Sequence, residues 1–371
     1  MIKNTNIEHG VVCRLENERF GYFAWPTVTM MEDGMIIVAS SGLRYYHVCA
    51  WGKTVLNYSS DNGCTWSAPD IINDTPLDDR DAGIISLGGK KLLISWFSTD
   101  ASKADEWLKD RLSEKEHKEI MEVALSNNEE TIRKWFGSWI RKRDDDGLWS
   151  DPVRVSVTAP HGPILLSNGE IFYLGMKMWQ LQDDNKTMSK GSIKAIKSFD
   201  GGETWVDMGD IPTDDDACNY HEPHVVELPS GKLIGLIRYQ KPRKKKNNII
   251  GMKFDDFYIY QTESEDGGKT WTKAHPTGVY GSPPHVIRHS SGALVCVYGY
   301  RKEPYGIRAM ISDDEGKTWN SDIVLRDDGI NTDLGYPASI ELKDGSIFTV
   351  YYQKLVGDKQ ASILWTRWRI D

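Results

Sequence analysis

Acidic, basic and aromatic side chains recur at two points of a repeated unit in this sequence, before its first apolar run and after its second. Carboxyl and imidazole groups exchange protons near neutral pH, and a guanidinium grips a carboxylate through two parallel charged hydrogen bonds. Brought together, such groups would transfer protons beside an anionic ligand, although polar residues also collect wherever a fold has a wet opening. The candidates are Trp25, Arg44, His47, Arg80, Asp81, His161, His221, Glu222, Arg238, Arg301, Arg308 and Tyr336.

An eight-residue motif, Ser-x-Asp-x-Gly-x-Thr-Trp, occurs four times, and a shortened copy occurs once. The full copies are residues 59–66, 198–205, 264–271 and 312–319, and the shortened copy is residues 145–149. In such a motif the Asp and Ser side chains bond nearby backbone N–H groups, the Gly takes a positive φ, and the Trp packs the hairpin onto its sheet. We interpret this motif, the Asp-box, as a structural turn.

A second repeat consists of two apolar runs joined by a glycine-containing turn, and it occurs six times. The turn glycines run from Gly34 to Gly345, 311 residues in five intervals, so the mean period is about 62 residues. Six such units account for the whole chain of 371 residues. A unit of four strands cannot bury both of its faces alone, so the units are expected to close radially. The sequence predicts an all-β fold, one six-bladed β-propeller over residues 1–371.

The phase of the repeat decides which loops meet. The glycine turns and the Asp-boxes lie on one face, so the loops that carry the candidate residues are expected to converge at the other face, around the axis. The chain ends without a last outer strand, and residues 7–15 are expected to supply it and remove an open sheet edge. Residues 101–141 break the pattern with apolar residues at helical spacing and a capping box at 113–116. This helical insertion could wall the ligand site or form the contact of a homo-oligomer.

Composition argues against several other classes of protein. With 45 Lys and Arg against 54 Asp and Glu, the net charge is −9, which disfavours nucleic acid as a partner. No stretch is apolar enough to cross a membrane and the first residues lack a signal-peptide pattern, so a cytoplasmic location is expected. Five scattered Cys residues without a Cys-x-x-Cys pair predict neither disulfides nor a zinc site, and no other metal or cofactor is expected.

With its boxes and its period, the chain resembles the sialidase superfamily of Asp-box propellers over nearly its whole length. Glu222 and Arg238 stand sixteen residues apart, in a segment similar to the one that carries the catalytic Glu and a substrate-binding Arg of that family. Residues 335–345 resemble the segment of the nucleophilic Tyr, which falls on Tyr336. The resemblance implies that Tyr336 attacks the anomeric carbon, Glu222 accepts its proton and Arg238 binds the substrate carboxylate.

Three positions depart from the family pattern. The Phe-Arg-Ile-Pro signature is here Phe-Ala-Trp-Pro, so the first arginine of the family is replaced by Ala24, and the Glu that orients that arginine falls on Tyr352. Loss of both partners together suggests a rebuilt subsite, because loss of one alone would leave an unpaired charge. The family's acid/base Asp has no counterpart. His47 is the titratable group nearby, and it is either a general acid or an ordinary surface residue.

Several candidates would bind substrate. Arg44 matches an Arg of the family, and Arg301 is preferred to Arg308 as a further anchor by its place in its blade. Arg80 and Asp81 stand in an acidic segment that either clamps sugar hydroxyl groups, with Asp81 as an additional catalytic residue, or stabilises its own loop through ion pairs.

His161, His221 and Trp25 complete the expected ligand face. The leading hypothesis is a sialidase-like, exo-acting glycosidase whose partner is a small, acidic glycan. One alternative is a β-propeller lyase, in which His or Tyr abstracts a proton beside an Arg-neutralised uronate. The other is a carbohydrate-binding propeller that has lost catalysis.

Overall fold

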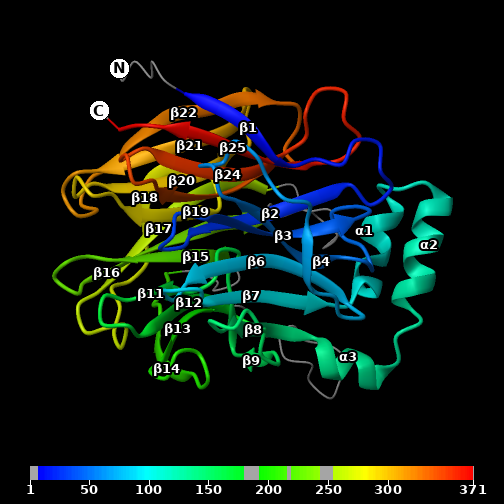
Figure 1. Cartoon of the computed structure of the whole chain (residues 1–371), viewed down its shortest axis with the longest axis horizontal. Coiled ribbons are helices and arrows are strands. Elements are labelled where there is room, and N and C mark those ends of the chain that lie inside the picture. Colours follow the sequence, from blue (N-terminus) through cyan, green and yellow to red (C-terminus); the bar gives the residue numbers. More distant parts are fainter. Residues whose placement is uncertain (1–6, 179–191, 215–218, 243–253, 371) are drawn as a thin grey trace.

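The chain forms six antiparallel sheets, and the inner strands of successive sheets contact one another, so the six-bladed β-propeller expected from the repeat is confirmed. Figure 1 labels their strands. The computed structural model describes residues 7–178, 192–214, 219–242 and 254–370. Each sheet has four strands, except that the third blade carries a short fifth strand. Within the described residues, no helix is long and apolar enough to cross a membrane.

The blades follow one another along the chain, and the strands of each blade are ordered from the axis outward. Blade one contains β2 (Tyr22–Met30), β3 (Ile36–Arg44), β4 (Lys53–Ser59) and β5 (Asp70–Asn73). Blade two contains β6 (Asp78–Ser86), β7 (Leu92–Thr99), β8 (Gly137–Arg143) and β9 (Val153–Val155). Blade three contains β10 (Val157–Thr158), β11 (Ile164–Leu165), β12 (Ile171–Lys177), β13 (Ile193–Ser198) and β14 (Val206–Asp210). Blade four contains β15 (Tyr220–Glu227), β16 (Leu233–Pro242), β17 (Phe254–Ser264) and β18 (His275–Tyr280). Blade five contains β19 (Pro284–Arg288), β20 (Leu294–Tyr300), β21 (Tyr305–Ser312) and β22 (Asn320–Gly329).

Blade six is built from both ends of the chain. It contains β23 (Gly335–Glu341), β24 (Ile347–Gln353), β25 (Ser362–Trp368) and, as its outer strand, β1 (Glu8–Cys13), which lies beside β25 in Figure 1. The prediction that residues 7–15 close the ring is therefore confirmed. Gly10 is required in β1 because a Cβ there would lie 2.3 Å from the Trp365 ring.

The Asp-box turns have the expected geometry. In the first copy, Gly63 N donates to Ser59 Oγ at 2.9 Å and Thr65 N donates to Asp61 Oδ1 at 2.9 Å. The same two contacts recur in the other three full copies. The glycine at this place has a positive φ in all four copies, for example 86° at Gly63. The boxes therefore hold turns on the outer part of the blades and carry none of the candidate chemistry.

The insertion in blade two is helical, but it ends earlier than expected. It contains η1 (Ala101–Ala104), α1 (Asp105–Lys109), α2 (Glu114–Ala124) and α3 (Glu129–Trp135), which lie together on one side of the molecule in Figure 1. Ser113 and Glu116 form the predicted capping box of α2. Residues 137–141, which were predicted to be part of the insertion, belong to β8, where they pair with β7. Residues 137–141 form a strand because the outer edge of β7 would otherwise be unpaired.

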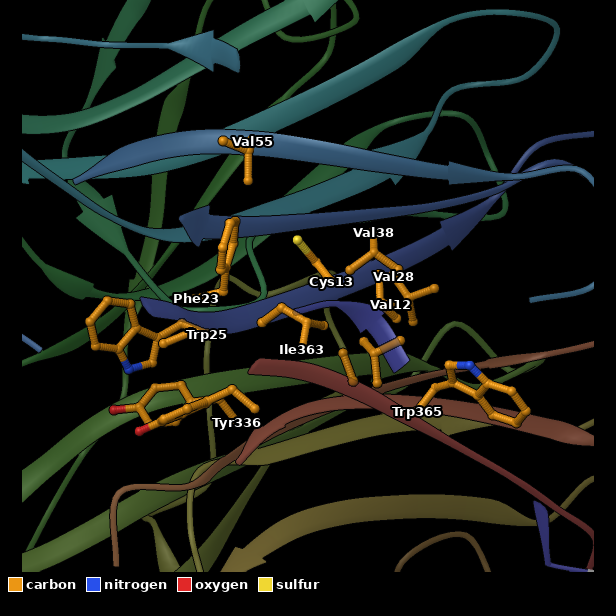
Figure 2. Close-up of a cluster of buried hydrophobic side chains, with 14 of the residues drawn as sticks. Val12, Cys13, Phe23, Trp25, Val28, Val38, Val55, Tyr336, Ile363 and Trp365 are labelled. Atoms are coloured by element: carbon orange, nitrogen blue, oxygen red, sulfur yellow. The ribbon is translucent and has the colours of Figure 1, made fainter. Parts of the chain in front are cut away.

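The core between blades one and six positions the site. Phe23 and Val38 of blade one pack with Ile363 of blade six, and all three are fully buried (Figure 2). Burial of each such side chain contributes about 1.5–3 kcal/mol. Trp25 and Tyr336 lie together at one end of the same cluster in Figure 2, so packing between blades determines where these two candidate residues meet.

Candidate active site

A bulge of the same kind recurs in the inner strands of four blades, and each one holds a candidate residue. The inner strands β2, β6, β15 and β23 all shift register near their starts. The residues inside these bulges have a positive φ: Trp25 53°, Asp81 50°, Glu222 44° and Tyr336 48°. Such a conformation costs a non-glycine residue about 1–3 kcal/mol and is concentrated at functional sites. Because a bulge re-aims a side chain, residues of blades one, two, four and six can meet near the axis.

Glu222, Arg238 and Tyr336 form a hydrogen-bonded cluster across blades four and six. Tyr336 Oη donates to Glu222 Oε1 at 2.7 Å, and Arg238 Nη1 donates to Tyr336 Oη at 3.0 Å. Arg238 Nη1 also forms an ion pair with Glu222 Oε2, and Arg238 Nη2 donates to Gln240 Oε1. The Glu222 and Arg238 side chains are 21% and 12% exposed, so solvent reaches the cluster. The three residues to which the resemblance assigned the chemistry are therefore in direct contact.

Burial and charge set the protonation of this cluster. Burial alone would raise the pKa of Glu222, but the Arg238 charge and the Tyr336 hydrogen bond outweigh it and lower that pKa. Burial and the Glu222 charge raise the pKa of Tyr336, and Arg238 offsets only part of the effect. Tyr336 therefore holds its proton at rest beside an ionised carboxylate, which is the arrangement that general base catalysis needs.

Asp81 is a buried acid in the same electrostatic environment. Burial raises its pKa to about 7, the Glu222 charge adds to this, and Arg80 opposes it. Of the residues that the structure describes, none hydrogen-bonds the Asp81 carboxyl group, which is 7% exposed. A carboxyl group that keeps its proton near pH 7 can donate that proton or a hydrogen bond.

A second polar cluster joins blades one and six around an acid, Asp333, that was not among the predicted site residues. Asp333 lies just before β23 and accepts hydrogen bonds from Tyr22 Oη at 3.0 Å and Tyr352 Oη at 3.1 Å. Its Oδ1 lies 3.1 Å from His47 Nδ1. Burial lowers the pKa of His47 although Asp333 opposes the shift, so His47 is mainly neutral at pH 7. The one signal for Asp333 in the sequence is its place three residues before Tyr336.

Aromatic rings pack together next to Ala24, the position at which the resemblance to sialidases would place an arginine. Ala24 and Tyr352 are both buried, and the Tyr352 ring lies 6.1 Å from the Trp25 ring and 6.0 Å from the Tyr336 ring. Both positions at which the resemblance would place the partners of an ion pair thus hold buried, uncharged side chains. Trp25 itself is only 1% exposed, so the expectation that it contacts substrate is corrected: its ring packs beneath the site.

Of the two arginines of blade five, Arg301 is the one beside Tyr336. The Arg301 Cζ lies 5.9 Å from the centre of the Tyr336 ring, and its guanidinium donates to Ser282 O at 2.6 Å and Leu334 O at 2.9 Å. Arg308 is buried, and it donates to Arg326 O at 2.8 Å within its own blade. Arg308 is therefore a brace of blade five, and its assignment to substrate binding is corrected.

Arg44 is also a support, because no part of it is exposed. It forms a buried ion pair with Asp78 at 2.7 Å and donates to the backbone oxygen of His47 at 2.9 Å. Its assignment as a substrate anchor is corrected on that ground. Arg80 lies nearer the surface, with Cζ 4.3 Å from the centre of the Trp25 ring and a hydrogen bond to His47 O at 3.1 Å.

The two candidate histidines lie in different places. His221 is half-buried next to Glu222 and contributes to lowering the pKa of that carboxyl group. His161 is fully buried and contacts His224 and His285, with ring centres 6.0 and 5.0 Å away, so its assignment to the same site as Tyr336 is corrected. In the described part of the chain, no group of three or more His, Cys, Asp or Glu residues is arranged to hold a metal.

The helical insertion packs on the loop of His47. The Trp107 ring of α1 lies 5.8 Å from the His47 ring and 5.9 Å from the Tyr46 ring. Leu108 and Ile120 are fully buried in a cluster with the residues around Cys49. The apolar face of α1 and α2 is thus buried within the chain, against the loop that carries His47.

The fold and this axial cluster define a β-propeller of the BNR type, whose blades carry Asp-box turns. Residues 134–349 match the BNR repeat-like domain, and the chain belongs to that family. No curated protein sequence matches the chain.

Solved structures resemble the protein over nearly its whole length. A protein of unknown function from Dyadobacter fermentans is 23% identical, with a TM-score of 0.74, over 99% of this chain and 100% of that chain. The intramolecular trans-sialidase of Ruminococcus gnavus is 15% identical, with a TM-score of 0.63, over 98% and 97%. An α-L-arabinofuranosidase of Fusarium graminearum is 14% identical, with a TM-score of 0.60, over 97% of both chains. At these identities the likeness concerns the fold, which glycosidases share with a protein of unknown function.

Proposed function

We propose that the protein is a sialidase-like, exo-acting glycoside hydrolase that releases an acidic sugar from a small glycan. The observation that carries this proposal is the 2.7 Å hydrogen bond from Tyr336 Oη to an ionised Glu222. A phenol paired with a carboxylate is a nucleophile with its base already in place. Arg238 touches both groups, and its guanidinium would also hold a substrate carboxylate.

In the proposed reaction, Tyr336 Oη attacks the anomeric carbon while its proton passes to Glu222 Oε1. The bond from that carbon to the leaving oxygen breaks, and the leaving oxygen takes a proton from Asp81. Water then attacks the anomeric carbon and gives up a proton to Asp81, while the bond from that carbon to Tyr336 Oη breaks and Glu222 returns its proton to the phenolate oxygen. Asp81 suits the acid role better than His47, because its pKa of about 7 keeps a proton available where His47 is mainly neutral.

The experiment is a screen of aryl glycosides of sialic acid, glucuronic acid and arabinofuranose. Tyr336→Phe and Glu222→Gln should each lower kcat by about 100-fold or more while the protein stays folded. Tyr58→Phe and Glu170→Gln are matched controls, since Tyr58 bonds Asp70 and Glu170 pairs with Lys197 away from the axis. Unchanged turnover in both site variants contradicts the mechanism.

The screen also separates the alternatives. Turnover of the arabinofuranoside alone would contradict the acidic substrate but leave the Tyr336–Glu222 pair in place. Ultraviolet absorbance of an unsaturated uronate would identify a lyase, because hydrolysis cannot form that product. Calorimetric binding of sugars without turnover would identify a carbohydrate-binding propeller.

A further inference from the structure

A cavity opens on the face opposite the candidate active site. Its volume is about 500 Å³, and it is lined by the later halves of the inner strands, including Thr27, Ile84, Val225 and Ser339. We call it the axial cavity. None of Asp81, Glu222, Arg238, Asp333 and Tyr336 lines it, since the bulges that hold three of these residues lie at the other ends of the same strands. The axial cavity is thus separate from the site described above.

Three buried histidines from three blades line the axial cavity. The rings of His224 and His285 are stacked with their centres 4.1 Å apart, and the ring of His161 stands edge-on to both. The three residues are at most 5% exposed. Burial lowers the pKa of each ring, so all three are neutral at physiological pH.

Backbone contacts fix which nitrogen of two rings carries the proton. Val286 N donates to His224 Nδ1 at 3.2 Å, and Ser339 N donates to His285 Nδ1 at 3.3 Å. A neutral imidazole that accepts at Nδ1 carries its proton at Nε2. His224 and His285 therefore have two Nε2–H donors side by side, and no described residue accepts from them.

His161 has one ring nitrogen without a partner. Thr27 Oγ1 lies 3.1 Å from His161 Nδ1 and 3.4 Å from Pro160 O, so Nδ1 has a hydrogen-bond partner in either tautomer of the ring. His161 Nε2 is buried without a hydrogen-bond partner among the described residues. An unpartnered buried polar atom costs about 1–3 kcal/mol, so a group that hydrogen-bonds with it would be stabilising.

We propose that the axial cavity is a binding site for a small molecule that carries a hydroxyl group on an apolar body. A hydroxyl group is both donor and acceptor, so it can accept from the Nε2–H groups of His224 and His285 and also pair with His161 Nε2 in either tautomer of that ring. The apolar body fits the apolar half of the lining, which includes Ile85, Ile164 and Val226, while Glu227 and Arg288 are among the polar residues of the other half. The volume lies within the range of small-molecule pockets.

Phenol and toluene are suitable probes, because they have the same ring and differ in the hydroxyl group. In ligand-observed NMR titrations at pH 8, we expect phenol to bind saturably and toluene to bind about tenfold more weakly. His285→Asn should weaken phenol about tenfold and leave toluene unchanged, because Asn Oδ1 can still accept from Ser339 N while the Nε2–H donor is lost. His275→Asn is the control, since His275 is exposed on β18.

A site for apolar molecules alone would bind both probes equally and would overturn the proposal. Equal phenol affinity in the parent protein and His285→Asn would overturn it as well. So would a crystal structure of the phenol complex in which an ordered water, and not the phenol hydroxyl group, hydrogen-bonds with the three histidines. Folding of the variant is checked by its thermal unfolding at pH 8. The result does not depend on the proposed glycosidase activity, because no turnover is measured.

Discussion

His224 should make the protein sensitive to acid, and His224→Asn tests this. The folded pKa of His224 is lowered from 6.5 to about 3 by burial. Between these values the unfolded chain binds a proton that the folded chain does not, so the free energy of unfolding falls as pH falls. The slope is about 1.4 kcal/mol per pH unit, which amounts to about 2 kcal/mol between pH 6.5 and 5.

The substitution removes this proton and keeps the local contact, because Asn Oδ1 can accept from Val286 N as His224 Nδ1 does. We expect His224→Asn to be less stable than the parent by about 1 kcal/mol at pH 7.5, from lost packing, and more stable at pH 5. Urea unfolding at four pH values measures the difference, with His275→Asn as the exposed control. A difference that is the same at every pH would refute the reasoning, because the parent would then bind the proton in both states.

Three further substitutions address the polar clusters. The pKa of Asp81 is raised to about 7 from its ordinary value of 3.8, so ionisation of Asp81 disfavours folding as the pH rises through this range. The free energy of unfolding of Asp81→Asn, relative to that of the parent, should therefore rise by up to about 4 kcal/mol between pH 4 and pH 8. A difference in urea unfolding that does not depend on pH would contradict this. Asp333→Asn removes the carboxylate that raises the pKa of His47, so an NMR titration should find that pKa lower than in the parent; no change would mean that the two side chains do not interact in solution. Arg44→Met removes the nearer of the two arginines that pair with the fully buried Asp78, since Arg80 Nη1 lies 3.5 Å from Asp78 Oδ2, and should cost about 3 kcal/mol in thermal or urea unfolding. A loss below about 1 kcal/mol would contradict the buried pair.

Local and periodic features were predictable because each depends on nearby residues. The Asp-box turn is closed by contacts within eight residues, as in Ser59 to Trp66, and the turn glycines such as Gly231 need a positive φ that other residues avoid. The count of units then determines the number of blades, and the missing last strand determines that β1 must close the ring. The end of the insertion was misplaced because residues 137–141 suit either a helix or the free edge of β7.

The roles of single side chains depended on contacts between blades. Arg44, Arg308, Trp25 and His161 all have residue types that bind substrates, yet each is buried by neighbours that lie far away in the sequence. Asp333 was missed for the converse reason: its partners come from another blade or from a neighbouring strand, and no local motif surrounds it.

The sequence by itself determined the ring and its turns, because a repeat is a local property, and the resemblance of two segments to sialidases singled out Glu222, Arg238 and Tyr336. Only the tertiary structure decided that Glu222 and Tyr336 touch, that Asp81 holds a proton, and that three histidines meet at the far end of the axis. The physical reason is that bulges with positive φ set the direction of the inner side chains, and closure of the ring sets their distances and burial. Neither can be read from the order of residues along one blade.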